Sequence, residues 1–349
     1  MSRLLMRFLL LTSLILAGGC ASGRLDPAAW QDERISMVWP PSRDQARIKL
    51  LRVIEEPEDV RSGQKGGMSR FLEFLLGARE EYVGFFTPQC IAADGNGLIY
   101  IADPSLGAVH RYDLAAREVR YIIQAGSRQL SGPVGVALDR EGNLYVTDTR
   151  LAAVFKFDRD GALIRELDSR GSLKKPVGVA ITSKGEKLIA DMGSNRVLRF
   201  GADDLLAGEL AVPAGDEPFN MPTYLAVDAA DTVYVTDSMN FRVRGFASDG
   251  RATVAIGQPG DGPGSFARPK GIATDSDGNL YVLDSIFGNF QIFDAKGRLL
   301  LYVGQEGNRP GEMMLPSGIF IDREDRIYVS DTFNHRIQVF QYLKEGNRK

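Results

Sequence analysis

A proline and an aspartate recur together along this chain at a fixed separation, and this repeat limits the possible folds more than any other feature of the sequence. Each aspartate stands fifteen residues after its proline, and no copy has an insertion between the two. The six pairs begin at Pro88, Pro133, Pro176, Pro222, Pro269 and Pro316 and end at Asp103, Asp148, Asp191, Asp237, Asp284 and Asp331. Regular self-similarity of this kind indicates a repeat architecture, in which each unit packs against its neighbours.

Each copy predicts four short antiparallel strands. An apolar run such as PVGVAL follows the proline, and a second run such as NLYVTD ends at the aspartate. Between these runs, nine residues after the proline, stands a residue that tolerates the positive φ of a tight turn. These turn residues are Gly97, Gly142, Gly185, Asp231, Gly278 and Asp325. A third run ends in an aromatic residue nine positions past the aspartate, and a polar turn leads to a fourth run.

The predicted strands are apolar on both faces, so one sheet alone leaves apolar surface in water. A ring of such sheets solves this problem, because each sheet covers the next. The sequence therefore predicts an all-β fold, a six-bladed β-propeller of four-stranded antiparallel blades over residues 85–343. We expect two sets of residues to be buried between blades. They are the apolar residues three positions before each proline (Phe85, Leu130, Leu173, Phe219, Phe266, Met313) and the aromatic residues that end the third strands (Tyr112, Phe157, Phe200, Phe246, Phe293, Phe340).

The sixth unit lacks a fourth strand, because a charged tail (344–349) follows its third run. The segment RIKLLRVIEE (47–56) resembles the fourth strand of unit five, GRLLLYVG. We expect it to pair with the last strand of the chain and to close the ring, which otherwise keeps an unpaired sheet edge. The next segment, 57–84, begins with a glycine-rich loop. Apolar residues at helical spacing then predict one short amphipathic helix at about 68–77.

Residues 1–19 have the pattern of a signal peptide, with Arg3 and Arg7 before a short apolar run. The run LAGGC, which ends at Cys20, resembles the bacterial lipobox, and this resemblance implies cleavage before Cys20 and acylation of its thiol. An ordinary secretory signal is the alternative. We therefore expect an exported protein, anchored to a bacterial membrane by acyl chains, with residues 20–46 as a lipidated tether. Ala21 is not the aspartate that signals inner-membrane retention, so the outer membrane is favoured.

The repeat pattern P-x-G-[VI]-A-x-D, G-N-x-Y-V-x-D and N-x-R-[VI]-x-x-F resembles the NHL repeat, most closely in units four to six. The resemblance covers residues 85–343 and implies a propeller. NHL-like propellers include RNA-binding and protein-binding domains, an amidating lyase and many exported bacterial proteins. The layout of this chain, with a lipobox, a tether, a closing strand and six repeats, is similar to the last group.

The six aspartates lie at loops on one face of the predicted ring, where a ring of carboxylates could suggest a cation. A residue present in every blade more often caps a turn by accepting bonds from backbone N–H groups. Three units also carry an arginine five residues later, namely Arg196, Arg242 and Arg336. We therefore expect a structural role for the aspartates and pairing with these arginines within each blade.

Catalytic metal chemistry has little support in the sequence. The chain has two histidines, His110 and His335, in units that become neighbours when the ring closes. We expect each to be a surface residue, although the two could approach each other. The amidating lyase, by contrast, would imply a histidine-rich metal centre. No cofactor is predicted, and a central Ca²⁺ or Zn²⁺ ion is left open.

Function in repeat proteins often lies where the repeats differ. Tyr224 replaces a glycine present in four other units, and the loops after the second strands vary in sequence. We expect a binding face formed by Arg150, Tyr224, Asn240, Phe241, Phe287, Phe333 and His335. Packing between neighbouring loops is the alternative for the aromatic residues.

The leading hypothesis is a monomeric, non-catalytic scaffold that binds an envelope protein or polysaccharide. Removal of Arg3 and Arg7 takes the formal charge from −3 to −5, which argues against a nucleic-acid partner. Two alternatives remain open. One is a metal-dependent lyase or lactonase-type hydrolase that uses the central channel, and the other is a purely structural envelope component.

Overall fold

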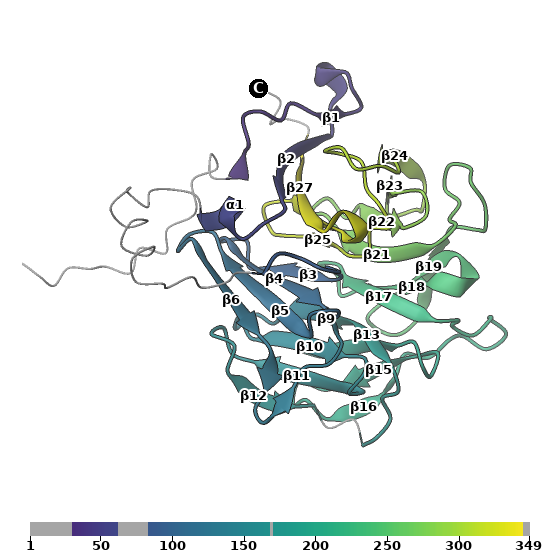
Figure 1. Ribbon diagram of the computed structural model, residues 1–349. Helices are drawn as coiled ribbons and strands as arrows, with labels where there is room; N and C mark the ends of the chain where they lie inside the picture. The colour runs from purple at the N-terminus through teal and green to yellow at the C-terminus, as the bar shows by residue number, and fades with distance from the viewer. Residues whose placement is uncertain (1–29, 62–82, 168–169, 345–349) are drawn as a thin grey trace, which may run out of the picture.

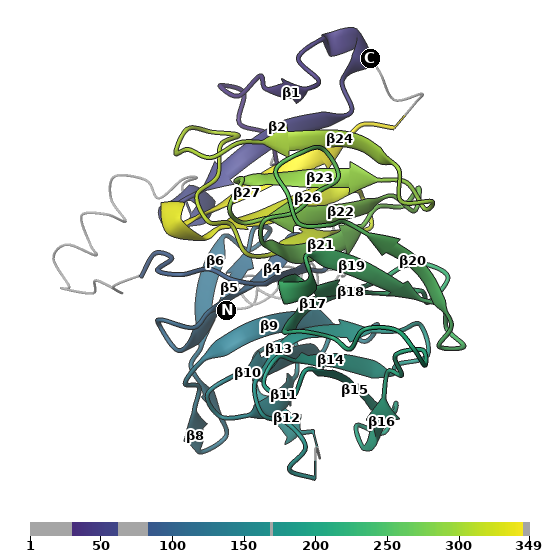
Figure 2. The same ribbon diagram turned by 90° about the vertical axis from the view of Figure 1, so that its right-hand side faces the viewer.

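The computed structural model describes residues 30–61, 83–167 and 170–344, and these residues form a ring of six antiparallel sheets (Figure 1). From β3 to β24 the chain completes one four-stranded sheet before it begins the next, and the inner strands of neighbouring sheets contact each other all round the ring. The sheets succeed one another in chain order in a second view as well (Figure 2). The predicted six-bladed propeller is confirmed.

Five blades have four strands each, numbered outward from the axis. Blade 1 contains β3 (Ile91–Ala93), β4 (Leu98–Asp103), β5 (Ala108–Asp113) and β6 (Glu118–Ile122). Blade 2 contains β9 (Pro133–Leu138), β10 (Leu144–Asp148), β11 (Ala153–Phe157) and β12 (Leu163–Glu166). Blade 3 contains β13 (Pro176–Ile181), β14 (Lys187–Asp191), β15 (Arg196–Phe200) and β16 (Leu206–Glu209). Blade 4 contains β17 (Pro222–Val227), β18 (Val233–Asp237), β19 (Arg242–Phe246) and β20 (Ala252–Ile256). Blade 5 contains β21 (Pro269–Thr274), β22 (Leu280–Asp284), β23 (Asn289–Phe293) and β24 (Leu299–Gly304).

Blade 6 has five strands because the N-terminal part of the chain joins it. Its strands are β25 (Ile319–Ile321), β26 (Arg326–Asp331), β27 (Arg336–Tyr342), β2 (Ile48–Ile54) and β1 (Val38–Trp39). The remaining elements are short. They are the hairpin β7 (Gln124–Ala125) and β8 (Arg128–Gln129), the helix α1 (Glu58–Arg61), and the 3₁₀ turns η2 (Arg43–Gln45), η3 (Ser238–Asn240) and η4 (Thr332–Asn334).

The hydrophobic core is divided among the interfaces between blades. The aromatic residues that end the third strands are at most 1% exposed, and the apolar residues before the prolines are at most 6% exposed. Members of the two sets pack on each other within a blade. Phe219 contacts Phe246 with ring centroids 5.8 Å apart, and Phe266 contacts Phe293 at 6.0 Å. Each such side chain contributes about 1.5–3 kcal/mol by its burial.

The turn between the first two strands of each blade has the positive φ that the sequence predicts, between 59° and 109° in all six blades. In two blades this turn residue is an aspartate, and its carboxylate also joins neighbouring blades. Asp231 accepts bonds from the backbone N–H and hydroxyl of Ser183 in blade 3, at 2.7 and 2.5 Å. Asp325 accepts the same two bonds from Ser276 in blade 5, at 2.9 and 2.8 Å. At both positions aspartate therefore forms hydrogen bonds between blades that glycine could not form.

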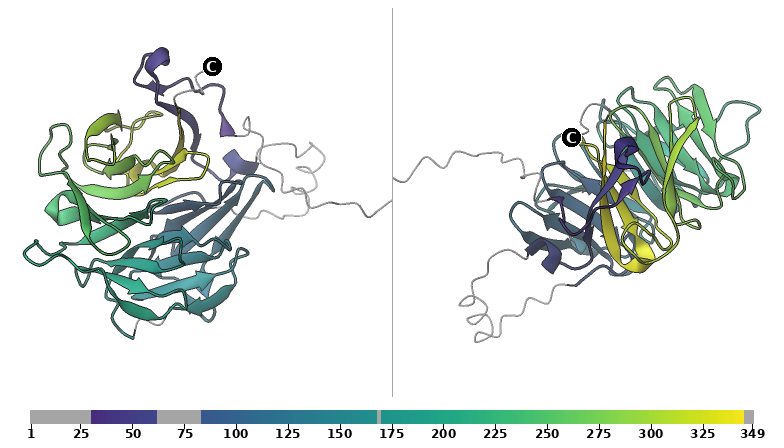
Figure 3. Two further views of the ribbon diagram at one scale, coloured as in Figure 1. Left: turned by 180° about the vertical axis from the view of Figure 1, so that it is seen from behind. Right: turned by 90° about the horizontal axis from the view of Figure 1, so that it is seen from above.

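The ring is closed by β2, which pairs with β27 from Ile48 opposite Tyr342 to Ile54 opposite Ile337. The two ends of the chain therefore lie side by side, with the purple β2 along the yellow β27 in two opposite views (Figures 1 and 3). Leu50 of β2 is fully buried in a cluster with Phe340. The predicted closing strand is confirmed.

The described part of the predicted tether packs on the propeller. Val38 and Trp39 pair with β2 and extend the sixth sheet by one strand. Trp30 is 3% exposed, and its ring meets the ring of Tyr328 edge-on at 6.0 Å. Residues 30–46 are thus part of the folded domain because two tryptophans bury apolar surface against blade 6.

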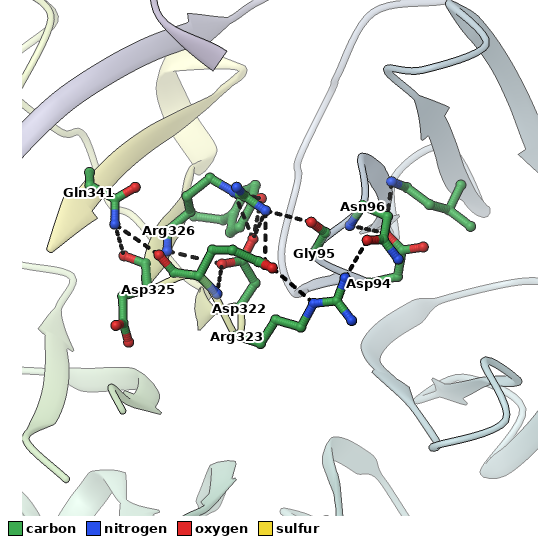
Figure 4. Close-up of polar contacts among 11 residues, drawn as sticks. Asp94, Gly95, Asn96, Asp322, Arg323, Asp325, Arg326 and Gln341 are labelled. Atoms are coloured by element: carbon green, nitrogen blue, oxygen red, sulfur yellow. Dashed lines mark hydrogen bonds and ion pairs between the residues drawn. The ribbon is translucent and has the colours of Figure 1, made fainter. Parts of the chain in front are cut away.

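Arg326 of β26 joins the sixth blade to the first (Figure 4). Its guanidinium donates to the Asp322 carboxylate at 2.9 Å and to the Gly95 carbonyl at 2.7 Å. The same guanidinium lies 4.3 Å from the centre of the Trp30 ring. Blade 1, blade 6 and the N-terminal segment therefore meet at one side chain.

Three predictions fall outside the described residues: the signal peptide, acylation of Cys20 and the helix at about 68–77. Within 57–84, the structure describes the four-residue helix α1. In the part of the chain that the structure describes, no helix is long and apolar enough to cross a bilayer.

Because β2 closes the ring, we expect the loss of a buried β2 side chain to lower the free energy of unfolding considerably. We expect Leu50→Ala to lower the free energy of unfolding by about 2–5 kcal/mol, because it leaves a cavity between blades. Leu300→Ala, on the equivalent strand of blade 5, removes a side chain that is 54% exposed and should change stability by less than about 0.5 kcal/mol. Urea unfolding of both variants measures the difference, and equal losses would contradict the assigned role of β2.

Candidate functional site

One end of the ring carries all the segments that differ most between blades, and we call it the loop face. In blades 2 to 5 the repeat proline pairs directly with the repeat aspartate, so both residues mark the same end of each blade. The loop face consists of the residues around each proline and the four residues after each aspartate. These are 86–89, 104–107, 131–134, 149–152, 174–177, 192–195, 220–223, 238–241, 267–270, 285–288, 314–317 and 332–335.

The six repeat aspartates are structural, as the sequence predicts. All are 0% exposed, and each accepts bonds from backbone N–H groups of the segment before the proline. Asp148, for example, accepts from Ser131 at 2.7 Å, Gly132 at 3.0 Å and Leu151 at 3.0 Å. Each carboxylate therefore fixes the linker between two blades to the loop after the second strand.

The pKa of Asp103 shows how the fold stabilises the negative charge of a buried repeat aspartate. Burial raises the pKa of this carboxyl, but nearby His110 and the N–H groups of Phe86 and Thr87 lower it, and the net result lies below the usual value. A charged carboxylate is therefore the form that holds the linker.

The predicted pairing with arginine is correct in two blades and wrong in the third. Arg242 donates to Asp237 at 3.2 Å, and Arg336 donates to Asp331 at 2.7 Å. Arg196 instead bonds Glu209 at 3.2 Å on the surface. Asp191 is already satisfied by N–H groups, and a carboxylate on the neighbouring strand β16 gives Arg196 an exposed partner.

Neither histidine forms part of a metal site. His110 is fully buried, so its expected surface position is wrong: its ring packs on Phe85, and its Nε2 lies 3.6 Å from Asp103. His335 is exposed, and its Nδ1 lies 2.6 Å from the carbonyl oxygen of Phe86. Across the residues described, no group of three His, Cys, Asp or Glu side chains could hold a metal ion.

The loop residues of the predicted binding face have different roles. Arg150 and Phe333 are exposed, whereas Phe241 and Phe287 are half-buried. Asn240 binds within the fold, because its amide donates to the Pro218 carbonyl at 3.0 Å and to the Asp237 carboxylate at 2.9 Å. The loops after the second strands therefore contain some residues that stabilise the fold and others that are exposed to solvent.

Five large apolar side chains are exposed on the loop face of four consecutive blades, 4, 5, 6 and 1. They are Met221, Met239, Ile286, Phe333 and Phe86, with exposed fractions of 39%, 47%, 45%, 56% and 57%. We call this group the apolar arc. Sequence reasoning identified Phe333 alone. The signal for Met239 and Ile286 was their equivalence to Phe333, two residues after the repeat aspartate.

Within the ranges given above, the charged residues of the loop face are all basic. Four exposed cations are Arg150, Lys174, Lys175 and Arg268, and Lys270 is half-buried. None of the loop-face residues defined above is acidic, although the formal charge of the whole chain is −3. Exposed acidic side chains adjoin these ranges, as with Glu217, which forms an ion pair with Arg242 at 3.2 Å.

Tyr224 lies in the central channel, one residue below the loop face, and is 6% exposed. The equivalent glycines are required in four blades, since a Cβ on Gly135 would overlap the Val177 carbonyl of the next blade. In blade 4 the Tyr224 ring reaches across the channel, and its hydroxyl lies 3.4 Å from the Gln89 amide oxygen. Tyr224 therefore narrows the channel instead of forming an open binding surface.

Below Tyr224 the channel contains a cavity of about 190 Å³. It extends along the inner strands to Leu138, Val227 and Ile321, and its lining includes no charged side chain. Cys90 also lines it, and burial raises the pKa of the Cys90 thiol. The cavity is thus uncharged, and its surface is divided about equally between polar groups and apolar side chains.

Lys270 stands at the mouth of the channel above Tyr224. Its Nζ donates to the Ser317 hydroxyl at 3.1 Å. Burial, and next the charge of Arg268, lower the pKa of Lys270 to about 8. A cation is therefore held where the surroundings disfavour it.

The fold and the loop face define a six-bladed β-propeller with its variable residues at one end. A family model described as a 6-bladed beta-propeller matches residues 224–289 and 273–346. No curated protein sequence matches the chain.

Several solved structures are similar in fold. An auxiliary nutrient binding protein from Bacteroides thetaiotaomicron has a TM-score of 0.60 at 14% identity, covering 76% of this chain and 71% of that chain. A gluconolactonase from Xanthomonas campestris has a TM-score of 0.59 at 15% identity, covering 84% and 98%. Virginiamycin B lyase from Staphylococcus aureus has a TM-score of 0.55 at 13% identity, covering 75% and 98%. Identities this low show a shared fold alone.

If the repeat aspartates are structural, their substitution should lower the stability of the fold, and a metal chelator should not change that stability. We expect Asp148→Ala to lower the free energy of unfolding by about 2–4 kcal/mol, since buried N–H groups lose their acceptor. Asp160→Ala, at an exposed turn of the same blade, should be nearly neutral. Thermal unfolding with and without EDTA checks both points, and a lower melting temperature in EDTA would indicate a metal ligand instead.

The lowered pKa of Lys270 predicts a pH-dependent stability. Between about pH 8 and 10.5 the folded state has lost the Lys270 proton and the unfolded state retains it, so stability should rise with pH in this range. We expect Lys270→Met to remove this rise and to be more stable than the native chain at pH 7, on the order of 1 kcal/mol or more. The exposed Lys174→Met is the control. Parallel stability curves for native protein and Lys270→Met between pH 7 and 10 would contradict the prediction.

Proposed function

We propose that this propeller is a non-catalytic, envelope-associated binding protein that receives a protein partner on its loop face. The apolar arc is the observation that carries the proposal. Exposed apolar side chains that gather on one surface of a folded domain are typical of interaction sites. Here they occupy equivalent or adjacent positions of four neighbouring blades, so one partner segment can contact several of them.

The chemistry of the loop face favours a protein over a polysaccharide. Met221, Met239 and Ile286 offer apolar surface without hydrogen-bonding groups, which suits apolar side chains of a peptide. The cations Lys174 and Lys175 lie on the other side of the ring, in blade 3, and suit acidic residues at the edge of the partner. The proposed partner is therefore a protein segment with apolar residues and some acidic ones.

Acylation of Cys20 belongs to the same proposal. The lipobox-like run LAGGC supports it. An anchor at Cys20 would hold the propeller at a membrane surface, through residues that join the fold at Trp30. The outer membrane remains the favoured location.

A metal-dependent lyase or hydrolase is the second candidate, and the structural likeness to virginiamycin B lyase and gluconolactonase favours it. It would require donors for a metal in or near the channel, and the lining of the channel cavity supplies apolar side chains. Elemental analysis of the purified protein separates the candidates, because a stoichiometric metal would support the enzyme. A purely structural envelope component is the third candidate.

The test is capture of a partner from detergent-solubilised envelope by three forms of the protein. The loop-face variant carries Met239→Ser, Ile286→Ser and Phe333→Ser. The control carries Ile164→Ser, Leu205→Ser and Leu300→Ser, which are equally exposed on outer strands and turns. We expect the native and control forms to recover the same partner, and the loop-face variant to recover at least about tenfold less, since central apolar contacts contribute most of the affinity. Equal recovery by both variants, confirmed with the purified partner, would contradict a binding role for this face.

A further inference from the structure

The half-buried Lys270 differs from Lys187, the lysine that is buried in the described part of the chain. Lys187 is 2% exposed, and it has an ion-pair partner in Asp204 and a bond to the Gly201 carbonyl. Lys270 forms no ion pair with any described carboxylate, and the neighbouring charge that acts on it is Arg268, which has the same sign. A poorly solvated cation without a counter-ion is costly, so its retention at the channel mouth needs another explanation.

The repeat aspartates of blades 5 and 6 are already occupied. Asp284, in the same blade as Lys270, accepts from the N–H groups of Ala267 at 2.7 Å and Arg268 at 3.0 Å. In blade 6, Asp331 is paired with Arg336. These carboxylates hold the linkers and leave the ammonium group of Lys270 without a counter-charge.

Hydroxyl groups converge with Lys270 at the mouth. Ser317 is fully buried, and its hydroxyl accepts from the Lys270 Nζ. The hydroxyl of Tyr224 lies 3.4 Å from the Gln89 amide oxygen. Burial raises the pKa of Tyr224, and the nearby Ser317 side chain opposes this rise. One ammonium and two hydroxyls from three different blades therefore meet at one point of the axis. Such a group suits a carboxylate, because charge-assisted bonds to it are stronger than neutral ones.

The surroundings select the kind of carboxylate. The apolar arc lies around this mouth on blades 4, 5, 6 and 1, and Tyr224 closes the channel beneath it. A chain end can enter a closed ring of loops without turning back, whereas an internal acidic residue must bring two flanking backbone segments across the axis. A C-terminal residue also presents a carboxylate next to an apolar side chain.

We propose that the channel mouth is a carboxylate subsite, in which the half-buried Lys270 ammonium, held from below by Ser317, receives the free C-terminus of an apolar segment of the partner. This inference rests on the proposed binding function of the loop face and specifies its ligand. In this arrangement Lys270 supplies the counter-charge, the buried Ser317 hydroxyl positions the Lys270 ammonium, and the apolar arc contacts the preceding side chains of the ligand.

The experiment uses acetyl-Phe-Ala-Leu with a free C-terminal carboxylate as the probe, and the same peptide with a C-terminal amide as its control. Binding to the native protein, Lys270→Met and Lys174→Met is measured by the shifts of the ¹³C-labelled lysine side chains. We expect the free acid to bind the native and Lys174→Met forms and to shift the Lys270 signal. Both amidation and Lys270→Met should reduce the affinity at least about tenfold. Lys270→Met keeps the length and apolar stem of the side chain, so its fold can be verified by circular dichroism.

Equal affinity for the acid and the amide, no effect of Lys270→Met, or no binding of either peptide would overturn the subsite. A hexuronate disaccharide that binds in a Lys270-dependent way, while the tripeptide does not, would overturn the peptide assignment in favour of a sugar carboxylate. The capture experiment keeps the two proposals separate. If Lys270→Met recovers the partner and the loop-face variant does not, the subsite is wrong and the binding function stands. If Lys270→Met and the loop-face variant both recover the partner, the binding function is wrong as well.

Discussion

The structure depends on one constraint: every blade is apolar on both faces and must be covered on both sides. A linear row of six such sheets would expose its first and last faces, and a ring exposes neither. Closure therefore decides whether the domain is stable. It is achieved by β2, which supplies the strand that the sixth repeat lacks, and by Arg326, which bonds the turn of the first blade. Together these contacts join the two ends of the chain.

The six aspartates allow the loop face to vary without loss of the ring. Each carboxylate holds the linker between blades through backbone N–H groups, and side chains of the linker or loop add to this support in some blades, as with Asn240 and Asn334. Those side chains are free to differ. In blades 2 and 3 they include the basic Arg150 and Lys174, and in blades 4 and 6 they include the apolar Met239 and Phe333. Blade 5 has both kinds, with Ile286 and Arg268. The repeats are therefore alike at the aspartates that hold the ring together and different at the loop side chains that a ligand would contact.

An auxiliary nutrient binding protein, a gluconolactonase and a virginiamycin B lyase are similar to this chain in fold alone, so the fold does not assign a role. The side chains at the loop face and in the channel decide between these roles, not the fold. In this chain the channel is narrowed by Tyr224 and has no charged side chain in the cavity below it, while exposed apolar and basic groups lie around its mouth. This distribution favours capture of a ligand at the mouth over chemistry within the channel.

Some of the candidate site could be predicted from the sequence. The positions of Arg150 and Phe333 on one face follow from the register of the repeat, because equivalent residues of all blades share one end of the ring. The surface position expected for His110 was wrong, since strand periodicity alone does not show that Phe85 and Tyr121 cover its ring. The partner of Arg196 and the burial of Tyr224 were also missed, because each depends on a neighbouring strand or blade.

The sequence by itself determined the number of blades, the turn positions with positive φ, the role of the aspartates and the identity of the closing strand. These features depend on local spacing and on hydrophobic pattern, which are readable along one chain. Only the tertiary structure decided that Trp30 joins the domain, that Met221 and Phe86 extend the apolar arc, and that Lys270 meets Ser317 and Tyr224 at the axis. Those contacts join residues from separate blades or from opposite ends of the chain, and their geometry is fixed only when the ring closes.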